Sequence, residues 1–343
     1  MKYRVITIAG LLLCMIAVWG FSGGWFLKRP VAVDATEFIM DTVVSVKLYH
    51  HDRKRGEELI AEAFKEALRI ERMMEAVKGD GEIRRLNQRD SNGWFELMPE
   101  LGIVLREAQK YHELSGGAFD PSVAPVKWLW DFEDGGYLPS QSELEQKLPS
   151  VGLENVTIHG DSILFLNSDI QLDLGGVAKG FAVDRMIEYL SSHGVESILV
   201  NAGGDIATLG KKPAATFFGA ESDWVIGMRH PRLNRTIVLK WNPYPAVATS
   251  GDYQRFFMKD GVRYHHIIDP ATGYPASKCA SVTVWTKSAM LADLLATTIF
   301  VLGPGKGVEF AESLDSVETL IYFERNGNVE SVMSSGIEGR IGI

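Results

Sequence analysis

Apolar residues recur along this chain with the spacing of helices in five places. The pattern predicts helices over residues 57–77, 100–114, 177–193 and 289–302, and a shorter helix near residues 307–313. Glycines follow the second, third and fourth of these segments, as expected where helices end. The helix over residues 289–302 is apolar nearly all round, which predicts that it is buried.

Other segments alternate between apolar and polar residues with the two-residue period of strands. Alternation predicts strands over residues 38–50, 197–200 and 281–285, and a short strand that ends at Leu174. Hairpins are expected around Gly160-Asp161, Asp260-Gly261 and Asn326-Gly327. Because strands outnumber helices and many are joined as hairpins, we expect an α+β fold with mixed or antiparallel sheets and packed helices, not a doubly wound parallel sheet.

The N-terminal segment has a different pattern. Lys2 and Arg4 precede an uncharged, mostly apolar run over residues 5–27, and Lys28-Arg29 follow it. A helix needs roughly 20 residues to cross a bilayer, and the run lacks a good small-residue cleavage point. We therefore expect an uncleaved membrane anchor over residues 1–29, a linker over residues 30–36, and one body over residues 37–343 at the extracytoplasmic face of the cell membrane.

Composition narrows the classes of partner and site. The chain of 343 residues carries a net charge of −9 and no basic run, which argues against nucleic acid as a partner. It has two cysteines, and Cys14 falls in the apolar N-terminal run, which leaves Cys279 alone in the body. A disulfide framework and a cysteine-based zinc site are therefore excluded from the body.

The segment Gln171-Leu-Asp-Leu-Gly-Gly-Val-Ala-Lys-Gly180 passes from the predicted strand through glycines into a helix. Unpaired N–H groups and the positive end of the helix dipole point the same way there, which favours an anion. Lys179 in the first turn opposes that dipole, and such local conflicts tend to mark functional sites. The alternative is a tight strand-to-helix turn with an exposed lysine.

Three further segments carry candidate chemistry. Thr249-Ser-Gly-Asp252 combines hydroxyls, a glycine and a carboxylate, and His266 and Asp269 straddle two apolar residues before a proline-fixed turn. The alternative for His266 is a turn or core histidine whose ring bonds to backbone. Asp293 and Thr297 lie one turn apart on one face of a predicted helix, where their oxygens suit Mg²⁺. The alternative there is a polar stripe, although a carboxylate in so apolar a helix needs a partner.

Taken together, the motifs resemble those of the ApbE-like FAD:protein FMN transferases from about Thr36 to Val332. The resemblance rests on six motifs in order: Phe119-Asp-Pro, Asp173-Leu-Gly-Gly-Val-Ala-Lys-Gly180, Asn201-Ala-Gly-Gly-Asp205, Thr249-Ser-Gly-Asp252, His266-Ile-Ile-Asp-Pro-x-Thr-Gly273 and Ala292-Asp-x-x-Ala-Thr297. It implies a T-fold-like body and an extracytoplasmic enzyme that binds FAD and Mg²⁺. Such an enzyme cleaves the pyrophosphate of FAD and transfers FMN to a threonine of a target protein, such as a subunit of a flavinylated redox complex, releasing AMP.

The resemblance also implies which residues form the site. The metal ligands would be Asp293, Thr297 and the main-chain carbonyl of Gly176. Contacts to FAD would come from a larger group: Met40, Ala118, Phe119, Asp120, Asp173, Lys179 and Ile268. A threonine hydroxyl is a poor nucleophile, and His266 has the side chain and position of a general base for it.

Three functions fit these observations. The first is the Mg²⁺-dependent flavin transferase, with Asp293 and His266 as catalytic residues. The second is a metal-dependent FAD pyrophosphatase in which water is the nucleophile and the products are FMN and AMP. The third is a non-enzymatic, membrane-anchored flavin-binding protein, against which the Asp293/Thr297 pair counts because storage needs no metal.

Overall fold

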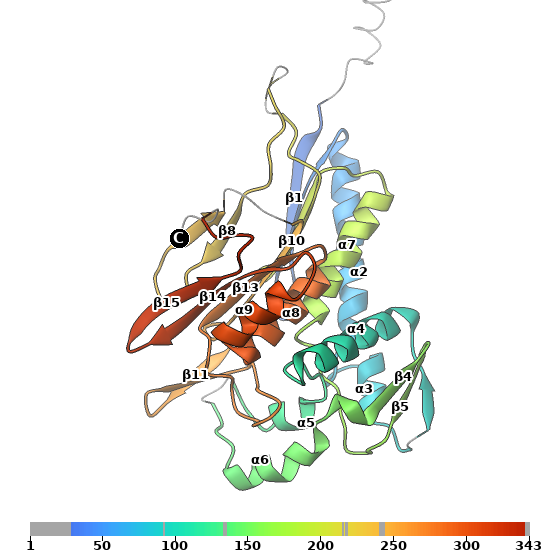
Figure 1. The fold of residues 1–343 in the computed structure, drawn as a ribbon. Coiled ribbons are helices and arrows are strands. Elements are labelled where there is room, and N and C mark those ends of the chain that lie inside the picture. The colour runs from blue at the N-terminus through green and yellow to red at the C-terminus, as the bar shows by residue number, and fades with distance from the viewer. Residues whose placement is uncertain are drawn as a thin grey trace, which may run out of the picture.

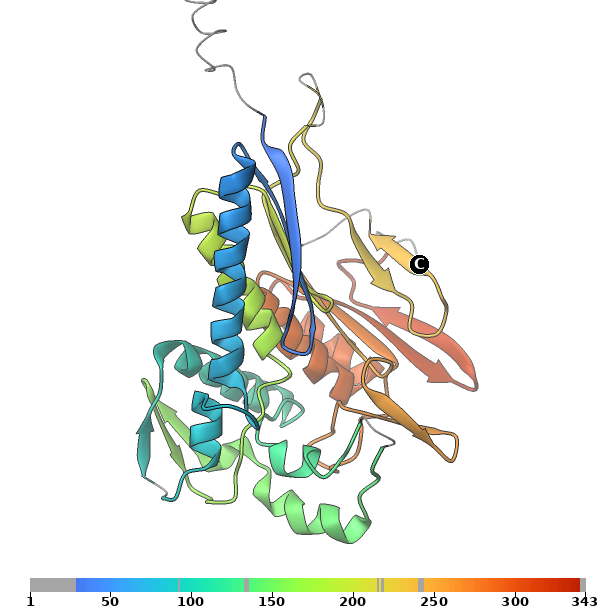
Figure 2. The ribbon, with the colours of Figure 1, turned by 180° about the vertical axis from the view of Figure 1, so that it is seen from behind.

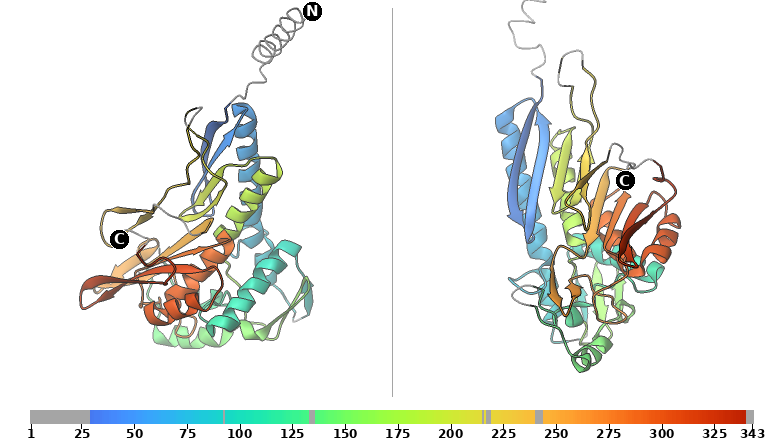
Figure 3. Two further views of the ribbon diagram at one scale, coloured as in Figure 1. Left: turned by 45° about the horizontal axis from the view of Figure 1, so that its top comes forward. Right: turned by 90° about the vertical axis from the view of Figure 1, so that its left-hand side faces the viewer.

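An eight-stranded antiparallel sheet runs through the protein (Figure 1). The computed structural model describes residues 29–91, 93–132, 136–214, 216, 219–239 and 244–339. Across the sheet the strands follow the order β1 (Val31–Ile39), β2 (Thr42–His50), β6 (Ile198–Ala202), β7 (Asp205–Leu209), β10 (Ala246–Gly251), β13 (Ser281–Thr286), β14 (Glu318–Arg325) and β15 (Asn328–Met333). Figure 3 shows β1 and β2 at one end of the sheet and β14 and β15 at the other.

Four helices form one layer on this sheet. They are α2 (Arg53–Met74), α7 (Ala178–Ser192), α8 (Ala289–Leu302) and α9 (Pro304–Glu312). Each contacts the next, and together they follow the sheet from β1 to β14. Figure 2 shows α2 standing along β1 and β2. A hairpin of β8 (Ile226–Arg229) and β9 (Thr236–Leu239) contributes to a separate apolar cluster with Val247, Trp285 and Leu320 of the sheet.

A second group of elements lies at the lower end of the molecule in Figure 1. A small sheet has the order β3 (Trp94–Glu96), β5 (Ser162–Phe165) and β4 (Val156–His159). The same group contains α3 (Glu82–Asn87), α4 (Pro99–Ser115), α5 (Ala124–Lys127), α6 (Gln141–Lys147) and two short 3₁₀ turns (Leu148–Ser150 and Leu153–Asn155). The hairpin of β11 (Phe256–Lys259) and β12 (Val262–His265) lies on the other side of this lower end in Figure 1. One buried apolar core joins Leu101 of α4 and Phe165 of β5 to Leu294 of α8, so the two groups pack as one body.

The sequence-based predictions of most elements are confirmed. The five predicted helices appear as α2, α4, α7, α8 and α9, and the three predicted hairpins as β4–β5, β11–β12 and β14–β15. The expected α+β class with antiparallel sheets is confirmed as well, since every strand pairing in the described sheets is antiparallel.

The predicted linker over residues 30–36 is wrong. Residues 31–36 belong to β1, which pairs along its whole length with β2, and Val33 is buried beneath α2. The single strand predicted over residues 38–50 is instead the end of β1, a turn and β2. Met40 and Asp41 make that turn with φ of 56° and 55°, the positive values that a tight two-residue hairpin turn requires. Such a turn is easily overlooked because it contains neither glycine nor asparagine.

The short strand predicted to end at Leu174 is also wrong. Gln171 makes only an isolated bridge to Val123. The side-chain amide of Asn87 takes the place of a neighbouring strand: its Oδ1 accepts from Leu172 N at 2.7 Å and its Nδ2 donates to Leu172 O at 2.8 Å. The alternation of Leu172 and Leu174 therefore reflects burial of a clamped loop.

The expected membrane anchor over residues 1–29 falls almost entirely outside the described residues. Within residues 29–339, apart from the gaps named above, the structure has no helix long and apolar enough to span a membrane.

Candidate active site

A cavity of about 1350 Å³ lies where the helix layer, the β1–β2 turn and the lower elements meet. Ligand pockets typically hold about 300–1,000 Å³, so this one has room for a large ligand. All eleven residues that the sequence assigned to a site line it: Met40, Ala118, Phe119, Asp120, Asp173, Gly176, Lys179, His266, Ile268, Asp293 and Thr297. They come from positions up to 257 apart in the chain (Met40 to Thr297), and the fold brings them to one place.

Three charged side chains form a cluster in one wall of the cavity. Lys179 Nζ of α7 lies 3.3 and 3.2 Å from the two carboxylate oxygens of Asp293 of α8, and 2.9 Å from Asp205 Oδ2 of β7. The Asp205 and Asp293 side chains are 4% and 5% exposed, whereas that of Lys179 is 27% exposed. The conflict between Lys179 and the helix dipole is thus resolved by two buried carboxylates, and the alternative of an exposed turn lysine is wrong.

The electrostatics of this cluster follow from burial and charge. Burial, together with the neighbouring Asp293 carboxylate, raises the pKa of Asp205. Burial alone would lower the pKa of Lys179, but the Asp205 and Asp293 carboxylates outweigh it and raise that pKa, so the ammonium is charged. Two buried carboxylates share this single ammonium.

Close packing of α7 on α8 builds the cluster. A Cβ on Gly180 would lie 2.2 Å from the carbonyl oxygen of Ala289, so only glycine lets the helices approach this closely. The approach allows Gly180 N to donate to Asp293 Oδ2 at 3.1 Å. Asp184, one turn further along α7, accepts from the free N–H groups of Ala289 and Met290 at 2.8 and 2.9 Å, which fixes the start of α8.

Hydroxyl oxygens continue the wall beside the carboxylates. Thr297 Oγ1 lies 3.4 Å from Ser250 Oγ, and an added Cβ on Gly176 would be 3.3 Å from Thr297 Oγ1. Asp205 Oδ2 is buried, and its close polar contact among the described residues is the Lys179 ammonium at 2.9 Å. Carboxylate and hydroxyl oxygens are the donors that Mg²⁺ prefers, and here two carboxylates that share one ammonium lie next to two hydroxyls. The donor set therefore fits a hard divalent cation.

Asp173 pairs with a different lysine. Lys127 Nζ donates to both carboxylate oxygens of Asp173 at 2.9 Å, and Gly175 N donates to Oδ1 at 2.8 Å. Burial alone would raise the pKa of Asp173, but the Lys127 charge and these hydrogen bonds lower it. Asp173 is thus a fixed anion that holds a cavity-lining lysine in place.

The two neighbouring histidines face opposite ways, as the two-residue period predicts. His265 is buried, with Nε2 2.9 Å from the carbonyl oxygen of Ala276 and Nδ1 accepting from Ile267 N. His266 lines the cavity, and its Nδ1 lies 3.4 Å from the carbonyl oxygen of Arg255. A carbonyl can only accept, so Nδ1 carries the proton and Nε2 keeps its lone pair. Desolvation, with the nearby charge of Lys127, lowers the pKa of His266 to about 3.

Residues 118–120 form a rigid loop under the cavity. Asp120 Oδ1 accepts from the backbone N–H and the hydroxyl of Ser122 at 2.8 and 2.5 Å, and Oδ2 accepts from Leu153 N at 3.1 Å. Burial raises the pKa of this carboxyl. Because its side chain is used inside the protein, Asp120 serves the site by shaping the loop that carries Ala118 and Phe119.

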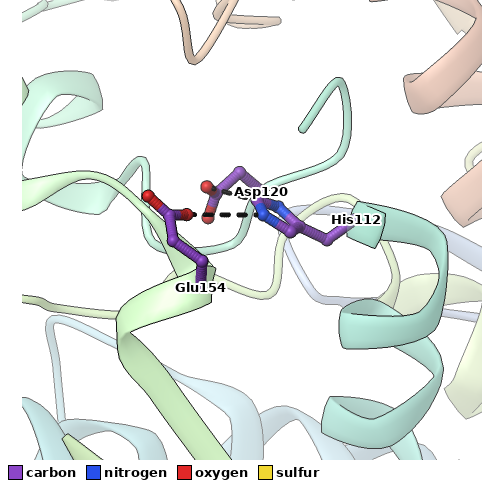
Figure 4. A group of neighbouring side chains, drawn as sticks. All are labelled: His112, Asp120 and Glu154. Atoms are coloured by element: carbon purple, nitrogen blue, oxygen red, sulfur yellow. Dashed lines mark ion pairs between the residues drawn. The ribbon is translucent and has the colours of Figure 1, made fainter. Parts of the chain in front are cut away.

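His112 of α4 links that loop to Glu154, as Figure 4 shows. Its Nδ1 lies 3.1 Å from the carbonyl oxygen of Phe119 and 3.4 Å from Asp120 Oδ2, and its Nε2 lies 3.5 Å from Glu154 Oε2. Each carboxylate therefore meets a different nitrogen of the ring. Through these contacts His112 bridges the loop and Glu154 and helps to fix the loop.

The carboxylate of the Thr249-Ser-Gly-Asp252 segment has a structural role. Arg232 pairs with both oxygens of Asp252 at 2.7 and 2.5 Å, and Arg263 Nη1 lies 3.0 Å from Oδ1. Arg232 Nε also donates to Glu324 Oε1 at 2.5 Å. The hydroxyl half of the same segment, Ser250, faces the cavity.

Sequence reasoning left three residues of the site unassigned: Asp205, Lys127 and Ser250. Asp205 ends the quoted Asn201-Ala-Gly-Gly-Asp205 motif, where a carboxylate at the start of an apolar strand was the available signal. Ser250 also stood in a quoted motif. Lys127 gave no signal, because its role depends on the loop that brings Asp173 beside it.

Comparison with known proteins gives consistent results. The sequence model of the ApbE family matches residues 40–321. The FAD:protein FMN transferase of Vibrio cholerae is 34% identical over 280 residues, covering 78% of this chain and 82% of the relative. The enzyme of the same name from Treponema pallidum is 31% identical over 332 residues, covering 92% and 90%.

Solved structures agree with this relationship. The crystal structure of the ApbE protein from Thermotoga maritima has a TM-score of 0.78 and 32% identity, covering 90% of this chain and 98% of that one. The flavin transferase ApbE from Vibrio cholerae has a TM-score of 0.78 and 30% identity, covering 90% and 99%. On its sequence and its fold, the chain belongs to the ApbE family.

Proposed function

We propose that this protein is an FAD:protein FMN transferase, which uses Mg²⁺ to move the FMN moiety of FAD onto a threonine hydroxyl of a partner protein and releases AMP. The relatives reported above bear that enzyme name, and the match to this chain covers most of their length. The observation that carries the proposal is the Lys179–Asp205–Asp293 cluster: two buried carboxylates and one ammonium in the wall of a cavity large enough for a dinucleotide.

Each part of the cavity has a task in this reaction. Asp293, Thr297 and the carbonyl of Gly176 would hold Mg²⁺, which would neutralise the charge of the pyrophosphate. Lys127 and Lys179, which both line the cavity, add positive charge. Phosphoryl transfer depends mainly on positioning and on such charge stabilisation, because the protein has little covalent chemistry to perform.

The bond changes balance without a further reactant. The threonine oxygen attacks the phosphorus of the FMN phosphate and forms a new P–O bond. The P–O bond to the bridging oxygen breaks, and AMP leaves with that oxygen. The hydroxyl proton passes to Nε2 of His266, the nitrogen that keeps its lone pair in the structure.

The lowered pKa of His266 fits a base that works only when substrate is bound. In the free protein, desolvation and the charges of Lys127 and Lys179 oppose a second proton on the ring. A bound pyrophosphate brings negative charge next to those lysines and reverses part of this effect. His266 then gains basicity at the moment when it has a proton to accept.

Incubation of the protein with FAD and Mg²⁺, with and without a threonine-bearing redox-complex subunit, tests the proposal. A transferase releases AMP and attaches FMN to the subunit, with little AMP in its absence. Equal release of FMN and AMP in both samples would identify a pyrophosphatase. Binding without any cleavage would identify a storage protein.

The cell membrane, at its extracytoplasmic face, is the location that we propose for the enzyme. Support comes from the sequence of residues 1–29, where an apolar run lies between positive charges. The mature protein should sit in the membrane fraction with this segment intact. N-terminal sequencing that finds a start near Gly23 would refute an uncleaved anchor.

A further inference from the structure

The Lys179–Asp205–Asp293 cluster has a charge imbalance that the proposed function alone does not explain. Lys179 lies within 3.3 Å of both carboxylates, where a divalent cation would also have to bind. A buried pair of carboxylates without a counter-ion is costly, so the free protein needs a cation there. An ammonium this close to a divalent cation, however, would repel it strongly.

We propose that Lys179 is a resident counter-ion that gives way to the catalytic cation: it neutralises Asp205 and Asp293 in the free protein, and turns into the cavity toward the pyrophosphate when Mg²⁺ binds between them. The inference rests on the proposed function and extends it to Asp205 and to a movement of Lys179. It also assigns Asp205 to the cation site, beside Asp293 and Thr297.

The surroundings of Lys179 allow this movement. Its side chain is 27% exposed and lines the cavity, whereas the carboxylates that hold it are almost fully buried. A lysine has a flexible four-carbon stem and a compact charge, so it can change partners without moving the backbone. Asp293 does not depend on Lys179 alone, because Gly180 N also donates to its Oδ2. Asp205 Oδ2 does depend on it, because the Lys179 ammonium at 2.9 Å is its close polar contact among the described residues.

The movement of Lys179 couples the binding of Mg²⁺ to the binding of FAD. While Lys179 occupies the site, Mg²⁺ competes with it and binds more weakly than the carboxylates alone would allow. Once displaced, the ammonium becomes available to the pyrophosphate, so FAD should bind better when Mg²⁺ is present. This coupling is reciprocal, and FAD should tighten the binding of Mg²⁺ by the same factor.

Mg²⁺ titration without FAD tests the first half of the proposal. We compare the full chain with Lys179→Met by calorimetry, and use Lys127→Met, which removes another lysine that lines the cavity, as the control. Removal of the competing charge should tighten Mg²⁺ binding by about tenfold or more in Lys179→Met, with a smaller change in Lys127→Met. Unchanged or weaker binding in a folded Lys179→Met would overturn the proposal.

Amine labelling of the unmodified chain tests the second half and does not depend on a variant that folds. A small amine-reactive reagent is applied with and without Mg²⁺, and labelling is measured by mass spectrometry at Lys179, with Lys127 as internal reference. Labelling of Lys179 relative to Lys127 should rise several-fold with Mg²⁺ as it leaves the carboxylates. An equal ratio in both samples would overturn the movement.

These measurements separate this inference from the proposed function. Mg²⁺-dependent release of Lys179 in a protein that transfers no FMN would support the inference and refute the function. FMN transfer with no change in the labelling of Lys179 would support the proposed function and refute the inference.

Discussion

Two ionic clusters are built around buried carboxylates, one around Asp252 and one around Lys179, and they differ in how completely their charges are paired. Around Asp252, the carboxylate meets two arginines, and Arg232 in turn reaches Glu324, so two positive and two negative groups balance. Around Lys179, one ammonium serves two carboxylates, and it is the close polar contact of Asp205 Oδ2 among the described residues. The charges of the first cluster balance within the protein, whereas the second has one carboxylate more than it has ammonium groups.

The difference separates a structural site from a functional one. In the sequence the two clusters look alike, because Asp252 and Asp205 each directly follow a glycine. Arg232 is planar and binds Asp252 through two parallel hydrogen bonds, a geometry suited to a permanent bond. Lys179 offers a compact charge on a flexible stem, which suits a temporary partner. The imbalance of charge, more than the presence of acids, marks the site.

The largest effect should come from Asp293→Ala. It removes the buried carboxylate that both Lys179 and Gly180 N contact, and with it a ligand of the proposed cation. Loss of several kcal/mol of charge stabilisation should lower the rate of FMN transfer on the order of 10⁴-fold. Single-turnover FMN transfer at saturating FAD measures it, and circular dichroism checks that the fold is kept.

Near-normal FAD cleavage by Asp293→Ala would show that this cluster is not part of the catalytic site. An unfolded variant would show that Asp293 is structural in the way that Asp252 is, and the contrast between the clusters would be lost.

Two neighbouring histidines at the end of β12 offer a second comparison between a structural and a functional residue. His266→Gln should slow FMN transfer by about 10²–10⁴-fold, the usual contribution of a general base, with little change in FAD affinity. His265→Gln alters a buried ring bonded to Ala276 and should affect stability more than rate. Equal loss of rate in both variants would indicate an effect on the fold, and lost FAD affinity in His266→Gln would make it a binding residue.

Asp252→Asn tests the balanced cluster. Breaking a buried pair leaves Arg232 and Arg263 without their shared anion and should lower the free energy of unfolding by about 3 kcal/mol. The rate of FMN transfer per folded molecule should remain close to that of the unmodified protein. Urea denaturation followed by tryptophan fluorescence measures the stability. A folded variant with a large loss of rate would place this cluster in the active site after all.

A smaller effect is expected from pH. Since the pKa of His266 is lowered to about 3 in the free protein, its ring is already neutral at pH 5. Protonation of His266 should therefore contribute no acid limb to kcat/KM between pH 5 and 7, because kcat/KM reports the free enzyme. The acid limb of kcat should lie at higher pH, since bound pyrophosphate raises this pKa. An acid limb of kcat/KM near pH 6.5 that disappears in His266→Gln would contradict this account.

The sequence predicted the elements and the members of the site better than their contacts. Helices α2, α4, α7 and α8 followed from apolar spacing because each buries one face or, in α8, nearly all of its surface. The prediction of a strand ending at Leu174 failed because Asn87, far away in the chain, makes the hydrogen bonds to Leu172 that a neighbouring strand would make. The prediction of a linker over residues 30–36 failed because β1 forms by pairing with β2 and not from a local sequence pattern.

The chemistry of the site shows the same limit. Motif spacing located Lys179 and Asp293, but it could not show that they touch each other, because that contact depends on the close approach of α7 and α8 at Gly180. Asp252 and Asp205 appeared alike in the sequence. Only the number of positive partners around each carboxylate distinguishes them, and tertiary packing sets that number.

The central claim is that the unbalanced cluster is the catalytic cation site. Crystals grown with FAD and Mn²⁺, which substitutes for Mg²⁺ and scatters anomalously, would test it most directly. We predict an anomalous peak bound by Asp205, Asp293 and Thr297, with the Lys179 ammonium turned toward the pyrophosphate. FAD bound in the cavity with the Mn²⁺ peak elsewhere, such as between His112 and Glu154, or with Lys179 still held between Asp205 and Asp293, would contradict it.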